Sequence, residues 1–386
     1  MQEHSEPVVA DVPAAPMPAA ANDSMPAPEA LSLVFTGSGK EYFRIWIVNL
    51  FLTVATLGIY SAWAKVRRLQ YFDRNTRLGG AAFDFRGDPK AILKGRVLAL
   101  CLAAGYHYAF GFSVTIGAAM AVLLMLALPF FLRSALRFRL HNTRYRGLHF
   151  DFSGSIGGAY LAYLPPLLTF LLPGALVAVD PSGAMTALAF LLYLGWPLMF
   201  GAMKRYQQGK LQFGGVGSIY RVAPWRFFKP YLIAIGIALS GSVGLALFVG
   251  IVVAIFGKLA GAESAMPSII AAMVAGYAIV LLIIPYIQAR IANLVWSNTS
   301  FPGVEIRCTM SAWDFIKLQT ANTLLTIVTL GLYRPFAVVR VYQYRLAQVS
   351  LHSTESFEQI VAGAARRPGG AAGDGMADFL GVDISW

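Results

Sequence analysis

Long runs of apolar residues decide what this chain can fold into. They belong to stretches that approach or exceed the ~20 residues that an α-helix needs to cross ~30 Å of hydrocarbon. Only 13% of the residues are charged, about half the share found in soluble domains. We therefore predict a polytopic α-helical membrane protein. The clearest runs are Val97–Leu102, Met120–Leu132, Leu161–Val179, Ala184–Met203, Tyr231–Phe256, Ile269–Ile287 and Leu324–Leu332.

The positive charge of the chain, +12 in total, is unevenly distributed. Basic residues crowd the loops that contain Lys65–Arg96, Arg133–Arg146 and Lys204–Lys229, whereas the alternate loops carry almost none. This asymmetry follows the positive-inside rule and places the basic loops in the cytoplasm. It argues against a nucleic-acid-binding protein and predicts an attraction to anionic lipid headgroups instead.

Two segments far apart in the chain are related without a gap. Asn49–Tyr71, "NLFLTVATLGIYSAWAKVRRLQY", aligns with Asn322–Tyr344, "NTLLTIVTLGLYRPFAVVRVYQY", at an offset of 273. The shared T-L-G-[IL]-Y and Q-Y pairs are too numerous for chance, and they predict an internal repeat.

A second register relates the middle of the chain to itself. "NTRLGGAAFDFRG" (Asn75–Gly87) matches "NTRYRGLHFDFSG" (Asn142–Gly154) at an offset of 67. We predict five units, each with a strand-like F-x-F-x-G piece, an apolar segment or pair, and a basic amphipathic helix on the cytoplasmic side. They lie near 33–82, 83–149, 150–212, 213–305 and 306–350 of a membrane domain at 31–350. The Pro/Ala-rich residues 1–30 are expected to form a disordered tail without a signal peptide, and 351–386 a flexible tail.

The stretch "LVFTGSGKEYF" (Leu33–Phe43) raises the alternative of a phosphate-binding loop. Such a loop needs a glycine where Val34 stands and a Ser or Thr where Glu41 follows Lys40. The equivalent stretches "FDFSGSIG" (Phe150–Gly157) and "CTMSAWD" (Cys308–Asp314) lack the lysine, so the lysine does not persist among the units. A turn that caps the next helix is therefore the better interpretation.

The run "FTGSGKEYFRIWIVNLFLTVATLGIYSAWAKVRRLQYF", together with "LVWSNTSF", resembles the YjgN-like family of bacterial inner-membrane proteins, whose domain has no known function. The resemblance covers most of Leu33–Leu351. It implies a multi-pass location in the inner membrane and implies no reaction, substrate or catalytic residue.

The number of crossings is the open question of this architecture. We count about eight apolar segments, one each in the first and last units and two in each central unit. If Ile45–Ala64 and Trp313–Tyr333 are full spans, they cross in opposite directions, as in inverted-repeat transporters. If they break at Gly58, Gly331 or Pro335, they re-enter the cytoplasmic side, which the positive-inside rule favours. Length favours eight true spans, and we adopt that expectation.

Polar residues near the related segments are candidates for ligand binding or gating, since ionisable groups within a membrane are costly. Glu41 and Arg44, and equally Asp314 and Lys317, have i,i+3 spacing on one helix face. Membrane-edge anchoring is the more ordinary role for these pairs. Asn49 and Asn322 lie deeper, where hydrogen bonds between helices are the more ordinary role.

The helix that follows each of these segments is basic and amphipathic. It can lie in the headgroup plane and bind anionic lipid, and several copies would form a cytoplasmic collar. The candidate lipid-binding residues are Lys65, Arg67, Arg68, Arg74, Arg137 and Arg139.

Catalytic machinery is not expected. The sequence has no nucleophile–base set, and its five histidines and two cysteines show no metal-ligand spacing, so we predict neither an enzyme nor a metal or cofactor site. The leading hypothesis is a transporter or channel for a small, anionic solute. The alternative is a non-catalytic scaffold that binds anionic lipid or a protein partner through its collar.

Overall fold

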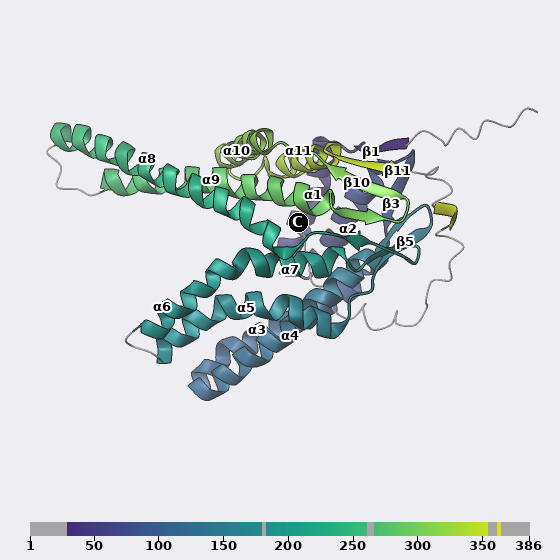
Figure 1. Cartoon of the computed structure of the whole chain (residues 1–386), viewed down its shortest axis with the longest axis horizontal. Coiled ribbons are helices and arrows are strands. Elements are labelled where there is room, and N and C mark those ends of the chain that lie inside the picture. The colour runs from purple at the N-terminus through teal and green to yellow at the C-terminus, as the bar shows by residue number, and fades with distance from the viewer. Residues whose placement is uncertain (1–28, 180–182, 261–265, 354–360, 364–386) are drawn as a thin grey trace, which may run out of the picture.

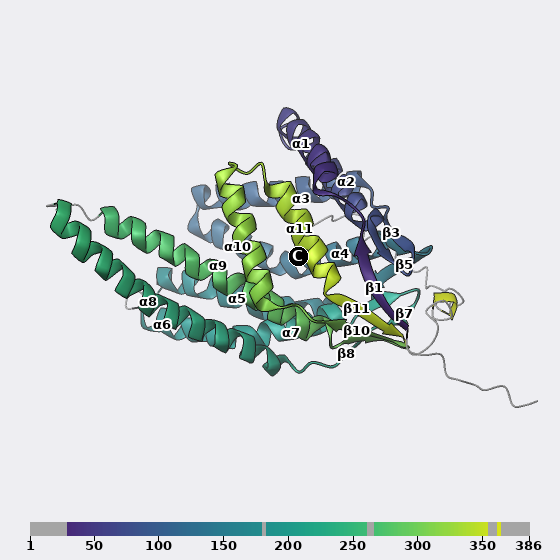
Figure 2. The ribbon, with the colours of Figure 1, turned by 90° about the horizontal axis from the view of Figure 1, so that it is seen from above.

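The computed structural model describes residues 29–179, 183–260, 266–353 and 361–363. A curved sheet lies at one end, and helical hairpins fan out from it (Figures 1 and 2). Most of the two predicted tails lies outside the described residues. Their inner ends, Glu29–Ala30 and Leu351–Ser353, pair with each other in the sheet.

The sheet contains eleven strands in the described part of the chain. Its order is β7-β6-β5-β4-β3-β2-β1-β11-β10-β9-β8, and every neighbouring pair is antiparallel. The two edge strands are consecutive in sequence and separated only by Ser218, so the sheet is nearly closed. The strands are β1 (Glu29–Phe35), β2 (Thr76–Leu78), β3 (Ala81–Phe85), β4 (Thr143–Tyr145), β5 (Leu148–Phe152), β6 (Leu211–Phe213), β7 (Val216–Gly217), β8 (Ile219–Tyr220), β9 (Thr299–Phe301), β10 (Val304–Cys308) and β11 (Val349–Ser353).

Helices account for most of the described residues. They form antiparallel pairs, with α1 on α2, α3 on α4, α5 on α6 and α7, α8 on α9, and α10 on α11. The α-helices are α1 (Gly39–Ala55), α2 (Ser61–Arg74), α3 (Pro89–Phe112), α4 (Val114–Asn142), α5 (Ile156–Val179), α6 (Ala184–Phe190), α7 (Trp196–Gln208), α8 (Phe228–Ala260), α9 (Met266–Trp296), α10 (Ala312–Val328) and α11 (Arg334–Ala347). Two short 3₁₀ helices are η1 (Leu191–Gly195) and η2 (Pro224–Phe227).

The F-x-F-x-G pieces join the strands to the helices. Phe85 and Phe152, the second aromatic residues of two such pieces, are almost fully buried beneath the helices. A Cβ on the following Gly87 or Gly154 would lie within 2.6 Å of the preceding phenyl ring. The glycine is therefore required because the ring packs directly against its backbone. The all-α prediction is not confirmed, because these strand-like pieces join into one continuous sheet.

The first and last hairpins correct the expectation of eight spans. β1 precedes α1, β2 follows α2, and the two strands pair through Leu33 and Leu78. β10 and β11 bracket α10 and α11 in the same way. Because the two ends of each hairpin meet in one sheet, the chain returns to the side from which it started, and single crossings by these two segments are not confirmed. Within the described residues, four helices are long and apolar enough to span: Val114–Asn142, Ile156–Pro173, Pro224–Ile251 and Ile269–Trp296.

The tip of each outer hairpin is formed by the T-L-G-[IL]-Y motif. Leu57 and Leu330 adopt φ of +50°, followed by Gly58 and Gly331 at φ of +92° and +93°. The glycine N–H donates five residues back, to Thr53 or Thr326, at 2.7 Å in both hairpins. This is a Schellman-type helix end. Gly58 and Gly331 are thus confirmed as break points, and the left-handed leucines are 96% and 94% exposed.

Candidate functional site

The most distinctive feature between the hairpins is a cavity of about 760 Å³ on the side nearer the sheet. Side chains from all five hairpins line it, including residues of α2, α4, α7, α9 and α11. This volume lies within the range of ligand pockets, ~300–1,000 Å³. The cavity is therefore large enough to hold a small molecule or a lipid headgroup.

The polar side of this cavity is cationic. Among the described lining residues none is acidic and six are basic. Such a concentration of like charge attracts anions, because the cations repel one another and a bound anion relieves that repulsion. We call these six residues the basic cluster: Lys65, Arg68, Arg139, Lys204, Arg334 and Arg345.

Helical spacing explains how α2 and α11 present their side chains. On α2 the lining positions 65, 68, 69 and 72 follow i, i+3, i+4, i+7, and on α11 the positions 338, 341, 342 and 345 do the same. Arg345 donates to the Gln288 side-chain oxygen at 3.1 Å, and its guanidinium lies 5.2 Å from the Phe315 ring. Its Nε is buried and has no hydrogen-bond partner in the described structure. Arg345 is therefore oriented by its neighbours while one donor stays available.

The cavity also has apolar lining residues. Most of them belong to α9 and α11, such as Ile287, Ile291, Val338 and Leu346. The lining therefore combines cationic and apolar side chains, which suits an anion that carries some apolar surface.

One buried carboxylate lies near this cavity. Asp73, in the last turn of α2 beside the sheet, is 8% exposed, and its Oδ2 has no hydrogen-bond partner in the described structure. Burial raises the pKa of Asp73 to about 6, although the charge of Arg139 opposes the shift. Because Arg139 lines the cavity, protonation of Asp73 would make the cavity more positive.

The structure places the candidate ligand or gating residues outside this cavity. Glu41 accepts the Ser38 N–H in a capping box, and Arg44 is exposed. Asp314 and Lys317 form an exposed ion pair of 3.8 Å. Asn49 and Asn322 are buried in α1 and α10, and both amide atoms of Asn322 lack a partner among the described groups.

The candidate lipid-binding residues separate into two groups. Lys65, Arg68 and Arg139 belong to the basic cluster. The other three contact the protein instead: Arg67 donates to Tyr60 Oη at 3.0 Å, Arg74 to Asp84 at 2.8 Å, and Arg137 lies 3.9 Å from Asp151.

Sequence reasoning did not single out Lys204, Arg334 and Arg345 as site residues. The internal repeat held one signal for Arg345. At the offset of 273, Arg345 occupies the position of Phe72, and both residues line the cavity. A second group was also missed. His141, His149 and Asp151 have a spacing that matches no standard metal motif, but they come together where α4 meets the β4–β5 hairpin.

Known proteins provide an independent comparison. A family model described as "Bacterial protein of unknown function (DUF898)" matches residues 30–379. Inner membrane protein YjgN of Escherichia coli strain K12 is 32% identical over 149 residues, which are 37% of this chain and 34% of that protein. Its namesake in Salmonella typhimurium strain LT2 is 34% identical over 146 residues, 36% of this chain and 35% of that protein. The alignment thus covers about a third of these relatives. No solved structure matches the chain significantly.

Proposed function

For this chain, which belongs to the DUF898 family of bacterial proteins of unknown function, we propose from its geometry that it binds an anion in the cavity between the hairpins and carries the anion across the membrane. The chain is an inner-membrane protein with several apolar helices able to span the bilayer. The proposed role is non-catalytic transport of a small anionic solute.

The observation that carries this proposal is the basic cluster. Six cations from four helices converge on one cavity that has no acidic lining residue in the described structure. Arg and Lys side chains recognise phosphate and carboxylate groups through charge-assisted hydrogen bonds. The shared chemistry of the ligand is therefore a phosphate or carboxylate group.

The apolar lining residues favour a second function. An anionic phospholipid would place its headgroup on the basic cluster and the start of its acyl chains against the apolar side chains of α9 and α11. The protein would then act as a lipid-binding scaffold, without solute flux.

Two measurements distinguish these functions. The first is phosphate efflux from phosphatidylcholine proteoliposomes. The second is thermal stabilisation of the detergent-solubilised chain by short-chain phosphatidylglycerol, against short-chain phosphatidylcholine at equal ionic strength. Efflux supports the carrier; stabilisation by phosphatidylglycerol without efflux supports the scaffold. If neither phosphate nor phosphatidylglycerol acts, anion binding is refuted.

Variants connect either result to the cavity. Arg345→Gln and Arg139→Gln each remove one charged contact, which is worth about 1.5–3 kcal/mol, so we expect affinity to fall about tenfold or more. Arg290→Gln is the matched control, because Arg290 is an exposed arginine on α9 that does not line the cavity. Equal effects of Arg290→Gln and Arg345→Gln would contradict the assigned site.

A further inference from the structure

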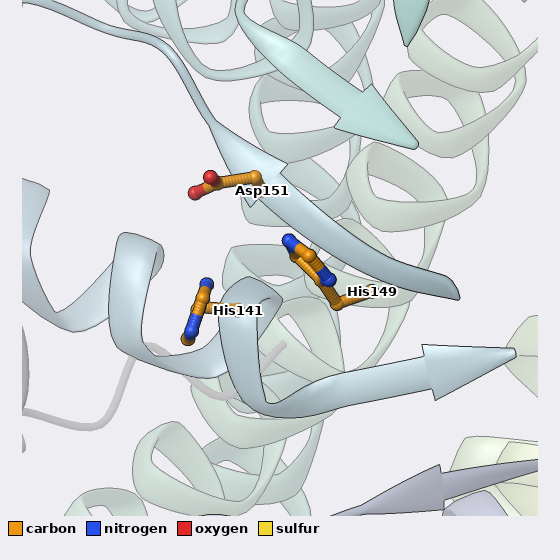
Figure 3. A group of neighbouring side chains, drawn as sticks. All are labelled: His141, His149 and Asp151. Atoms are coloured by element: carbon orange, nitrogen blue, oxygen red, sulfur yellow. The ribbon is translucent and has the colours of Figure 1, made fainter. Parts of the chain in front are cut away.

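Two histidines and an aspartate converge at the junction of α4 with the sheet. His141 lies in the last turn of α4. His149 and Asp151 are two residues apart on β5 and therefore share one face of that strand. Each side chain offers a ligand atom, and these atoms lie within 4.8 Å of one another. Figure 3 shows the three side chains gathered around one space.

The earlier copy of this motif, around Asn75–Gly87, has a different set of residues at the same positions. At the offset of 67, Arg74 corresponds to His141, Ala82 to His149, and Asp84 to Asp151. Asp84 accepts hydrogen bonds from Arg74 and Arg86, each at 2.8 Å.

The later copy of the motif lacks both of these arginines. His141 stands at the position of Arg74, and Ser153 stands at the position of Arg86. The carboxylate that is held by two arginines in the earlier copy thus lies beside two imidazoles in the later one. One backbone arrangement therefore supports two different chemistries.

We propose that His141, His149 and Asp151 form a binding site for a divalent transition-metal ion such as Zn²⁺ or Co²⁺. Imidazole nitrogens and a carboxylate oxygen are ligands for such ions, at ~2.0–2.2 Å. The donor atoms that lie farthest apart must approach one another by about 1–1.5 Å to reach this geometry, through rotation of their side chains. Three protein ligands leave a coordination position open for water or an anion.

The surroundings of Asp151 specify how it would bind. Its Oδ1 accepts the Phe152 N–H at 2.7 Å and lies 3.9 Å from Arg137 Nε. Both contacts use Oδ1, so the metal would bind through Oδ2. The nearby guanidinium repels a metal cation, and Arg137 therefore limits the affinity of the site.

The first test is titration of the purified full chain, carrying a tag without histidine, with Co²⁺ in detergent. We expect one Co²⁺ per chain, seen as a visible ligand-field band that Zn²⁺ displaces. His149→Gln and Asp151→Asn should weaken binding at least about tenfold, and Arg137→Gln should strengthen it. His352→Gln, on β11 of the same sheet, is the control and should bind as the wild type does.

Absence of Co²⁺ binding by the wild-type chain would overturn the proposal, as would equal loss in His149→Gln and His352→Gln. A second variant does not depend on the stability of those mutants. Arg74→His combined with Ala82→His places two histidines beside Asp84 and so reproduces the three ligands in the earlier copy of the motif. We expect the stoichiometry to rise from one Co²⁺ to two. A folded double variant that still binds one would contradict the geometric argument.

Discussion

The two outer hairpins, α1–α2 and α10–α11, share a scaffold and differ where they face the cavity. In both, a serine caps the first helix, and a tyrosine of the second helix donates to the backbone carbonyl of that serine. The Tyr71–Ser38 bond is 2.8 Å and the Tyr344–Ser311 bond is 3.0 Å. At both tips an arginine also donates to a tyrosine hydroxyl, at 3.0 and 2.9 Å.

The cavity-facing positions have diverged between the same two hairpins. At the offset of 273, Lys65 corresponds to Val338, Arg68 to Val341, and Phe72 to Arg345. Residues that are identical in the two copies therefore hold the hairpin together, whereas residues that differ shape the cavity. The two related hairpins therefore contribute different side chains to the cavity.

The sharpest test of the comparison asks whether both hairpins return to the same side. Single cysteines replace Val34, Arg77, Arg307 and Ala347, which are exposed positions flanking the two hairpins, in a chain whose Cys101 and Cys308 are changed to Ala. We expect an impermeant thiol reagent to label none of them in intact spheroplasts and all of them after lysis.

The control for this experiment is Val114→Cys, at the far end of the α3–α4 hairpin, which should label before lysis. Labelling of Arg307→Cys or Ala347→Cys before lysis would mean that the last hairpin crosses the membrane and that the equivalence fails.

The next largest effect concerns Asp73, which corresponds to Leu346 in the other hairpin. Because burial raises its pKa from 3.8 to about 6, the folded state holds the proton more tightly than the unfolded state. That stabilisation is complete below pH 4 and is lost as the pH rises through 6. Asp73→Asn should therefore raise the free energy of unfolding at pH 8 by about 1–3 kcal/mol.

Thermal unfolding in detergent measures this effect, and the difference from wild type should shrink toward pH 4. Asp84→Asn is the contrasting variant. Although partial burial opposes the shift, hydrogen bonds from Arg86 and Arg74 lower the pKa of Asp84. Its loss should therefore destabilise the protein at pH 8. A pH-independent gain for Asp73→Asn would contradict the assignment.

A smaller effect tests the shared tyrosine. Tyr71→Phe and Tyr344→Phe should each lower the free energy of unfolding by about 0.5–1.5 kcal/mol, the net worth of one hydrogen bond. Tyr71→Phe should cost slightly more, because its hydroxyl also lies 3.3 Å from Glu41. Denaturant unfolding measures both variants. If only one of them is destabilised, the tyrosine hydrogen bond does not have the same role in the two hairpins.

The smallest effect lies at the tips. Leu57→Gly and Leu330→Gly relieve a left-handed leucine and should each raise stability in detergent by about 0.5–1 kcal/mol. In liposomes the gain should vanish, because each substitution also removes the contact that the exposed leucine makes with lipid in the wild-type protein. A loss of stability in detergent in both variants would show that the leucines pack within the protein.

Local patterns predicted part of this structure. The apolar runs indicated membrane helices. Gly58 and Gly331 were break points only in the alternative that was not adopted, and the structure places both glycines at positive φ, which glycine tolerates. The sheet was missed because its strands contain only two to seven residues, and the β1–β11 pairing joins residues more than 300 positions apart. Periodicity over so few residues carries little information about pairing.

The candidate site was harder to predict for the same physical reason. Lys65, Arg68 and Arg139 were chosen as lipid-binding residues, but their convergence with Arg345 depends on how all five hairpins are arranged around the sheet. His141 and His149 illustrate the same limit, because the β4–β5 hairpin brings them together at a spacing that matches no standard metal motif.

The pairing of β1 with β11 has a consequence for biogenesis. The first strand of the described chain meets its last strand, Leu31 opposite Leu351. During synthesis β1 therefore lacks this neighbour until more than 300 further residues have been made. The remaining break in the sheet lies at Ser218, between β7 and β8. In a circular permutant that joins the two chain ends by a linker and opens at Ser218, every pair of neighbouring strands would also be consecutive in sequence. Its sheet would then assemble in the order in which the strands emerge from the ribosome.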